Sequence, residues 1–228
     1  MDRLDSVLAV ATPLLTRVDD LLGTMGAPAD HEVWRQLRRV RLLPGDAART
    51  VAALRPGEFD DAVGLLRADA RACADVAAEL PPPVEWEGDA AEAYAELRGR
   101  VAARLSGDGE SLDERLEASA DLAQALIDWM AKARSDLAVA LATALGSQEA
   151  LTLSADEALS VSAKDAPEPA AWLAVGHAGD AGHAGDAGDA PQAAAAVGAH
   201  VLRAIAESYA EADDLLQASA DLAEAVPM

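Results

Sequence analysis

Three consecutive prolines, Pro81, Pro82 and Pro83, most constrain how this chain folds. A proline has no backbone donor and its ring clashes with the preceding turn, so no helix runs through all three. Trp86 and Gly88 follow, and from Asp89 the sequence becomes Ala-rich. Glycine adopts backbone angles that are closed to other residues, and Asp89 is a suitable N-cap. The sequence therefore predicts a helical hairpin whose tight turn carries an aromatic side chain.

The segments on both sides of this turn show helical periodicity. Apolar residues recur at alternating spacings of four and three, as in a coiled-coil seam. Cys73 falls on the first of these stripes, where a buried small hydrophobe is expected rather than a nucleophile. The first stripe consists of Phe59, Val63, Leu66, Ala70, Cys73, Ala77 and Leu80, and the facing stripe of Tyr94, Leu97, Val101 and Leu105.

The N-terminal part is expected to form three helices. An amphipathic first helix contains Pro13 and ends near Gly23. Asp30 is expected to cap a second helix. A short third helix is expected at residues 46–54, between two Pro-Gly pairs.

Beyond the hairpin, capping-box patterns predict further helix starts. The box from Ser111 to Glu114 begins a long helix that ends at Gly146, and a box at Ser154 begins a short one. Residues 164–190 are rich in glycine, and this composition is typical of a flexible linker. Pro191 suits the first turn of a last amphipathic helix.

These patterns predict an all-α, elongated antiparallel helical bundle in four segments. Residues 116–126 resemble residues 216–226, so these helices either pack in equivalent positions, share an origin by duplication or converged as Ala-rich heptads. The segments are the N-terminal helices at 1–57, the hairpin and long third helix at 58–146, the short helix and linker at 147–190, and the C-terminal helix at 191–228.

Composition excludes several classes of function. The formal net charge of −22 disfavours binding to nucleic acid or to an anionic membrane. Only 3% of residues are aromatic, so small aliphatic side chains must build the core. One cysteine forms no intrachain disulfide framework. We see no signal peptide and no apolar run long enough for membrane insertion.

The sequence carries no recognisable catalytic pattern. It lacks zinc-ligand spacing, a phosphate-binding Gly-rich loop and a nucleophile elbow. His177, Asp180, His183 and Asp186 lie in the Gly-rich linker, where ordering the chain around a metal costs entropy. We therefore predict a protein that is not an enzyme and holds no cofactor or metal.

A dense basic cluster, Arg35, Arg38, Arg39 and Arg41, falls on the predicted second helix. One interpretation is a solvated face that pairs with acidic neighbours. The other is a docking patch for an acidic partner.

The residues from Trp86 to Tyr94, Trp-Glu-Gly-Asp-Ala-Ala-Glu-Ala-Tyr, resemble the turn of the WXG superfamily, the helical-hairpin proteins of type VII secretion. Actinobacterial members read Trp-x-Gly-x-Ala-Ala-x-Ala-aromatic, commonly with phenylalanine where Tyr94 stands. The resemblance continues through about residue 145, in a chain over twice the usual length. It implies a hairpin that takes part in export.

A second motif lies on the predicted last helix. Tyr209 and Asp213 resemble the Tyr-x-x-x-Asp/Glu secretion signal of type VII substrates, which acts in that family together with a Trp-x-Gly turn. Their spacing places them one turn apart on one helical face.

The resemblance implies a substrate or partner of a type VII secretion system, with Trp86, Gly88, Tyr209 and Asp213 as a composite export signal. The expected partners are the secretion machinery or a WXG-type helical protein, the expected state is a monomer or heterodimer, and export needs no cleavable signal. The alternative is an acidic adaptor or chaperone-like protein that stays in the cytoplasm and binds a partner helix in a groove.

Overall fold

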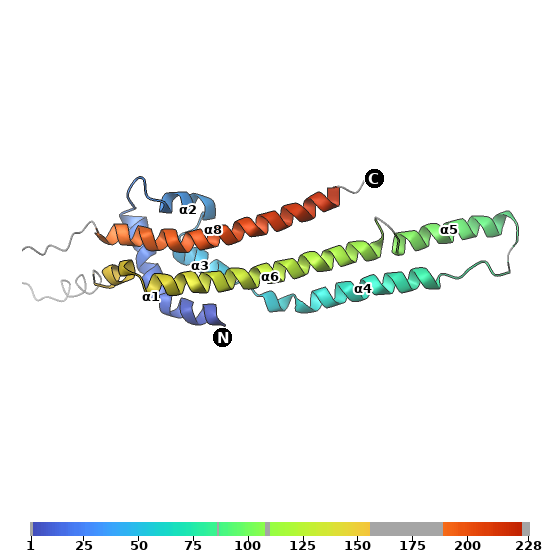
Figure 1. The fold of residues 1–228 in the computed structure, drawn as a ribbon, viewed down its shortest axis with the longest axis horizontal. Coiled ribbons are helices and arrows are strands. Elements are labelled where there is room, and N and C mark those ends of the chain that lie inside the picture. Colours follow the sequence, from blue (N-terminus) through green and yellow to red (C-terminus); the bar gives the residue numbers. More distant parts are fainter. Residues whose placement is uncertain (1, 86, 108–109, 156–188, 225–228) are drawn as a thin grey trace, which may run out of the picture. The chain divides into compact units, whose positions relative to one another are not determined.

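The computed structural model describes residues 2–85, 87–107, 110–155 and 189–224. These residues form helices joined by short connections, and the described ranges contain no strand (Figure 1). The protein is an all-α helical bundle, as predicted.

The chain divides into two compact units. The first comprises Met1–Leu54 and Ala133–Tyr209, and the second comprises Arg55–Lys132 and Ala210–Met228. The long helices α6 (Leu112–Leu145) and α8 (Asp189–Glu224) contribute to both units. The two units therefore do not coincide with the four segments expected from the sequence, because each long helix supplies residues to both units.

The first unit begins with α1 (Arg3–Thr24), which ends where its periodicity predicts and contains Pro13. Its N-terminus carries a capping box. The Asp2 carboxylate accepts from the Leu4 amide, and the Asp2 amide donates to the Asp5 carboxylate. The box satisfies amide groups that have no partner within the helix.

The second helix, α2 (Val33–Val40), starts differently from the prediction. Asp30 does not cap it; Nδ1 of His31 accepts from the Val33 amide at 3.1 Å. Asp30 stands too far before the first helical residue to serve as its N-cap. Arg41 lies outside the helix, at φ 62°, and ends it in a left-handed conformation.

The third helix, α3 (Pro44–Ala52), begins two residues before the expected start. Proline is accommodated at the first helical position, where its missing donor is not needed. The Asp19 carboxylate of α1 accepts from the Gly45 amide at 3.1 and 3.2 Å. A side chain from α1 thus caps α3, and burial raises the pKa of Asp19.

Small aliphatic side chains fill the core of this unit, as composition predicts. Gly198 of α8 allows close approach of three helices, since an added Cβ would lie 3.1 Å from Leu22 Cδ1 and 3.2 Å from Pro44 Cγ. The largest fully buried apolar side chains include Leu4, Val18, Val33, Val51, Leu137, Leu141, Leu153, Val201, Leu202 and Ile205.

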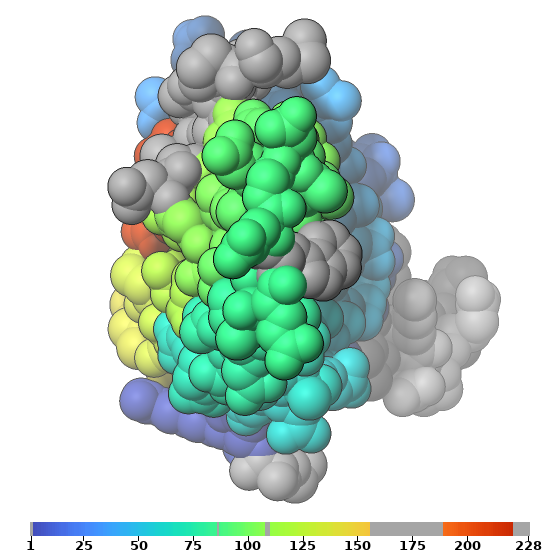
Figure 2. Space-filling view, turned by 90° about the vertical axis from the view of Figure 1, so that its right-hand side faces the viewer, coloured from blue at the N-terminus to red at the C-terminus, as the bar shows by residue number. Residues whose placement is uncertain are grey.

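The second unit is built on the predicted hairpin. Helix α4 (Asp60–Glu79) follows a 3-10 turn at Pro56–Glu58, and α5 (Asp89–Leu105) runs back in the opposite direction after the connection at residues 80–88 (Figure 1). The two helices contact one another, and their segments are neighbours in the space-filling view (Figure 2). Gly88 is the N-cap of α5 and has φ 81°, the left-handed region that glycine favours. Asp89 is therefore the first helical residue and not the cap.

The predicted stripe on α4 matches the structure at most positions. Val63, Ala70 and Ala77 are buried, and Cys73 is half-buried on the same stripe. Phe59 is an exception at 50% exposure, because it precedes the helix and its side chain is outside the seam.

The predicted stripe on α5 is wrong at two of its four positions. Leu97 and Val101 are 51% and 38% exposed, and Ala91 is the buried residue of this helix. The inward face instead follows Ala91, Tyr94 and Arg98. A polar side chain occupies this face because Arg98 Nε donates to the Leu80 carbonyl at 2.8 Å.

Two predicted capping boxes are not formed as expected. The Glu114 amide donates to its neighbour Asp113 and not to Ser111. The Ser111 hydroxyl lies within hydrogen-bond distance of two acceptors, the Asp113 carboxylate and the Gly107 carbonyl, and has one hydrogen to donate. Ser154 lies within a helical segment, Gln148–Ala155, and its hydroxyl donates to the Ala150 carbonyl. Ser154 is therefore not an N-cap. Glu157, the other residue of this predicted capping box, lies outside the described residues, as does nearly all of the predicted linker, 164–190.

Candidate functional site

The hairpin turn places Gly88 directly before α5. Trp86 lies outside the described residues. The Tyr94 hydroxyl donates to the Pro81 carbonyl at 3.0 Å, and Arg98 bonds Leu80. Since prolines 81–83 have no amide to donate at the end of α4, side chains from α5 supply the donors. The aromatic residue of the resemblance therefore closes the base of the turn.

The second predicted signal lies within α8. Tyr209 and Asp213 are separated by one helical turn. Tyr209 is partly buried, and this burial raises the pKa of its phenol. Asp213 is exposed. A partly buried aromatic ring and an exposed carboxylate are thus presented along one helix.

The arginine cluster does not form a single patch. Arg35 and Arg38 line one cavity. Arg39 donates to the Ala206 carbonyl at 3.3 Å, and Arg41 ends α2. Arg35 pairs with its acidic neighbour Glu32, whereas Arg38 has no partner among the described residues.

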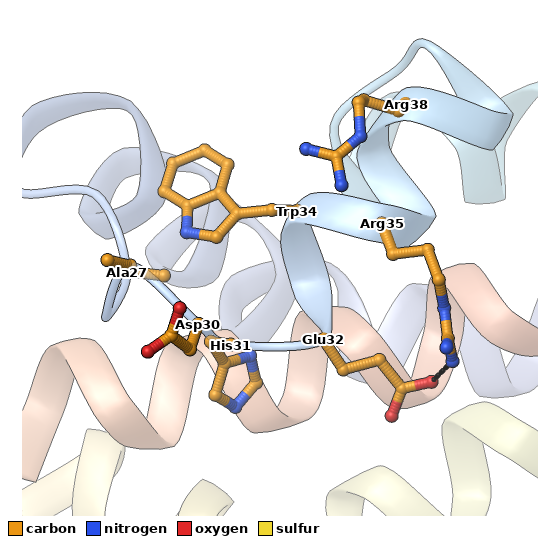
Figure 3. Close-up of a pocket in the computed structure, with 8 residues that line it drawn as sticks. Ala27, Asp30, His31, Glu32, Trp34, Arg35 and Arg38 are labelled. Carbon is orange, nitrogen blue, oxygen red and sulfur yellow. Dashed lines mark hydrogen bonds and ion pairs between the residues drawn. The ribbon is translucent and has the colours of Figure 1, made fainter.

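The cavity beside Trp34, called the Trp34 cavity, has a volume of about 800 Å³ and is open to solvent (Figure 3). It is formed by α2 and the loop before it, all within the first unit. Its lining consists of Ala27, Ala29, Asp30, His31, Glu32, Trp34, Arg35 and Arg38.

Glu32 is the most strongly perturbed acid of this region. Arg203, Gln36 and Arg35 bond its carboxylate, the last at 2.6 Å, and together they hold its pKa at about 2. The carboxylate is therefore ionised at any ordinary pH and serves to order the arginines around it.

A second cavity of about 430 Å³, called the Trp129 cavity, lies between α6 and α8 within the second unit. The ion pair of Lys132 with Glu211, at 2.9 Å, lies on it. Trp129 is half-buried there. The other lining residues are Ala125, Asp128, Asp214 and Leu215.

The sequence interpretation missed Arg134. Its side chain is only 7% exposed, and it bonds two carboxylates and two carbonyls. No local pattern in the sequence marks this arginine as buried, because its acceptors lie far away in the chain.

Neither cavity contains the machinery of a recognisable reaction. Among the described residues no group of three or more His, Cys, Asp or Glu side chains is arranged to hold a metal ion. No described helix alone has the length and apolar character to cross a membrane; α6 and Gln148–Ala155 meet both criteria only as a pair bent by 59°. Comparisons with protein-family models, curated proteins and solved structures find no match.

Proposed function

We propose that this protein is a WXG-like substrate or partner of a type VII secretion system and acts without catalysis. The α4–α5 hairpin carries the proposal: its turn has a glycine at φ 81° directly before an Ala-rich helix, at the position where the resemblance expects one. Trp86, Gly88, Tyr209 and Asp213 would form the export signal.

The second half of the signal suits recognition by a receptor. Asp213 is exposed, and Tyr209 is held in place by partial burial on the same helix. A rigid helix presents such a pair with little loss of conformational entropy on binding. The expected partners are the secretion machinery or a WXG-type helical protein, with a monomer or a heterodimer in solution.

Export from an actinobacterial host with an active type VII system tests this proposal. We expect to find the protein in the culture filtrate of that strain. In a strain whose secretion ATPase is inactive, we expect it in the cell fraction alone. Asp213→Asn should abolish export and leave the circular dichroism spectrum unchanged, because this side chain is exposed. Glu207→Gln, another exposed carboxylate on α8, is the matched control.

Tyr209→Ala should also abolish export, whereas Tyr209→Phe keeps the ring and separates the role of the hydroxyl. Retention of the wild-type protein in cells despite an active system would contradict the proposal. Undiminished export of both Asp213→Asn and Tyr209→Ala would remove these residues from the signal.

A second candidate function rests on exposed apolar side chains of the hairpin. Leu65 and Val76 of α4 and Leu97 of α5 are 65%, 51% and 51% exposed. Such side chains suit an adaptor that binds a partner helix. Under this function the protein stays in the cytoplasm, and Leu97→Glu would end co-purification of the partner helix. An unchanged complex would argue against this function.

A further inference from the structure

We propose that the Trp34 cavity binds an acidic peptide segment, whose carboxylate pairs with Arg38 and whose adjacent apolar side chain lies against the Trp34 ring. This interaction is additional to the proposed export signal, which uses other residues. Of the four arginines in the basic cluster, the proposal assigns recognition of charge to Arg38 alone, and it adds Trp34 as the residue that contacts an apolar side chain.

The Trp34 ring is fixed before any ligand arrives. Its Nε1 donates to the Pro28 carbonyl at 2.9 Å, so the polar edge of the indole is already satisfied. Gly26, at φ 75°, turns the chain under the ring, where an added Cβ would lie 3.8 Å from it. The ring is only half-buried and stands at the cavity (Figure 3). An apolar group gains contact with a preorganised surface at small entropic cost.

Arg38 lies one turn after Trp34 on α2, and its guanidinium reaches back toward the ring in Figure 3. Its side chain has no hydrogen bond or ion pair with any residue that the structure describes, and the residue is exposed. A guanidinium has five donors in a fixed fork that matches a carboxylate. Arg38 is therefore free to bind an external anion.

The local charge favours an anion although the protein as a whole is acidic. Two arginines, Arg35 and Arg203, share the single carboxylate of Glu32, so this group keeps a net positive charge. The guanidinium of Arg38 adds a second positive charge. Asp30 also lines the cavity, but its carboxylate lies beside Ala27, on the other side of the ring from Arg38 in this view (Figure 3). The net charge of −22 repels an acidic segment from the chain as a whole, whereas these arginines attract it to the Trp34 cavity.

The shape and lining of the cavity favour a peptide over a bare anion. The volume of about 800 Å³ lies within the range of ligand sites, roughly 300–1,000 Å³, and the open side leaves room for a continuing chain. Phosphate alone would use Arg38 but not the indole face. A peptide in which acidic and apolar residues alternate uses both.

Fluorescence anisotropy of a labelled peptide in which Glu alternates with Phe, added to the full-length protein, tests the proposal. We expect binding that Arg38→Gln weakens by about tenfold, the loss typical of one charge-assisted pair. Arg39→Gln removes the same charge from the same helix outside the cavity and should bind as the wild type does. Arg38→Glu should reject this peptide.

Trp34→Ala should also weaken binding, with circular dichroism to show that the helices persist, while Trp34→Phe should retain most of it. The same peptide with Gln in place of Glu should not bind. Equal losses in Arg38→Gln and Arg39→Gln would show diffuse electrostatic attraction and overturn the proposal. Inorganic phosphate that competes as well as the peptide would show an anion site without peptide recognition, and the proposal would fail. Absence of binding by the wild type would also reject it.

Discussion

The Nε–H of Arg134 donates to the carboxylate of Asp2, 2.9 Å away, and so fixes the N-cap of α1 to the middle of the chain. The same guanidinium bonds Asp5 at 3.0 Å and the carbonyls of Ala52 and Leu54 at the end of α3. A buried arginine is stable here because every side of its fork has an acceptor. One side chain thus joins three helices of the first unit.

Replacing Arg134 should destabilise the first unit strongly. Arg134→Met removes the hydrogen bonds to two carboxylates and two carbonyls from a buried position. We expect a loss of about 2–4 kcal/mol in the free energy of unfolding. Arg134→Lys should lose about 1–2 kcal/mol, because an ammonium cannot reproduce the planar fork. Urea denaturation measures both, and an exposed residue of the same helix, Lys132, provides the control through Lys132→Met. Equal effects of Arg134→Met and Lys132→Met would contradict the role assigned to burial.

Tyr94→Phe should loosen the hairpin turn. The phenylalanine keeps the ring but leaves the Pro81 carbonyl without the hydroxyl donor 3.0 Å away. Since this carbonyl is accessible to water, we expect a loss of about 0.5–1 kcal/mol. Hydrogen exchange of the α5 amides should therefore accelerate several-fold. Tyr209→Phe is the control, because the Tyr209 hydroxyl has no hydrogen-bond partner among the described residues. An unchanged exchange rate in Tyr94→Phe would show that the bond to Pro81 adds nothing to the stability of the hairpin.

Two glycines should respond to substitution with opposite signs. A Cβ at Gly198 would lie 3.1 Å from Leu22 and 3.2 Å from Pro44, so Gly198→Val should cost about 1–3 kcal/mol. A Cβ at Gly64 meets nothing within 4 Å on α4, so Gly64→Ala should stabilise by about 0.5–1 kcal/mol. Thermal unfolding of both variants measures the shifts. An unchanged or raised midpoint in Gly198→Val would refute the close packing there, and a lowered midpoint in Gly64→Ala would refute the open space on α4.

The stability of the first unit should depend on Glu32 in acid. Its pKa falls from 4.5 in the unfolded chain to about 2 in the folded protein, chiefly through Arg203. A lowered folded pKa means that the stabilisation is complete above pH 4.5 and is lost as the pH falls toward 2. We expect Glu32→Gln to be less stable than the wild type at pH 7 and to approach it as the pH falls through this window.

Other carboxylates titrate in the same range, so the difference between variants is the quantity to follow in urea titrations. Glu207→Gln, which removes an exposed carboxylate of α8, should change little at any pH. A constant difference between the wild type and Glu32→Gln from pH 7 to pH 2 would be inconsistent with the lowered pKa.

The sequence determined the elements whose signals are local. Periodicity predicted the ends of α1 and α6 and the stripe through Val63, Ala70 and Ala77, because a helix of 3.6 residues per turn must bury one face. The prolines and Gly88 predicted the hairpin turn, because both residue types restrict the backbone before any packing occurs.

Only the tertiary structure decided which polar groups meet and which apolar residues remain outside. His31 and Asp19, and not the expected Asp30, satisfy the amides at the starts of α2 and α3. Tyr94 and Arg98 turn the inner face of α5 away from Leu97 because carbonyls of the proline segment require donors. Arg134 is buried and Arg39 reaches the Ala206 carbonyl because partners distant in the chain place their acceptors there. Helix periodicity is encoded within a few turns, whereas the pairing of buried polar groups depends on residues that only folding brings together.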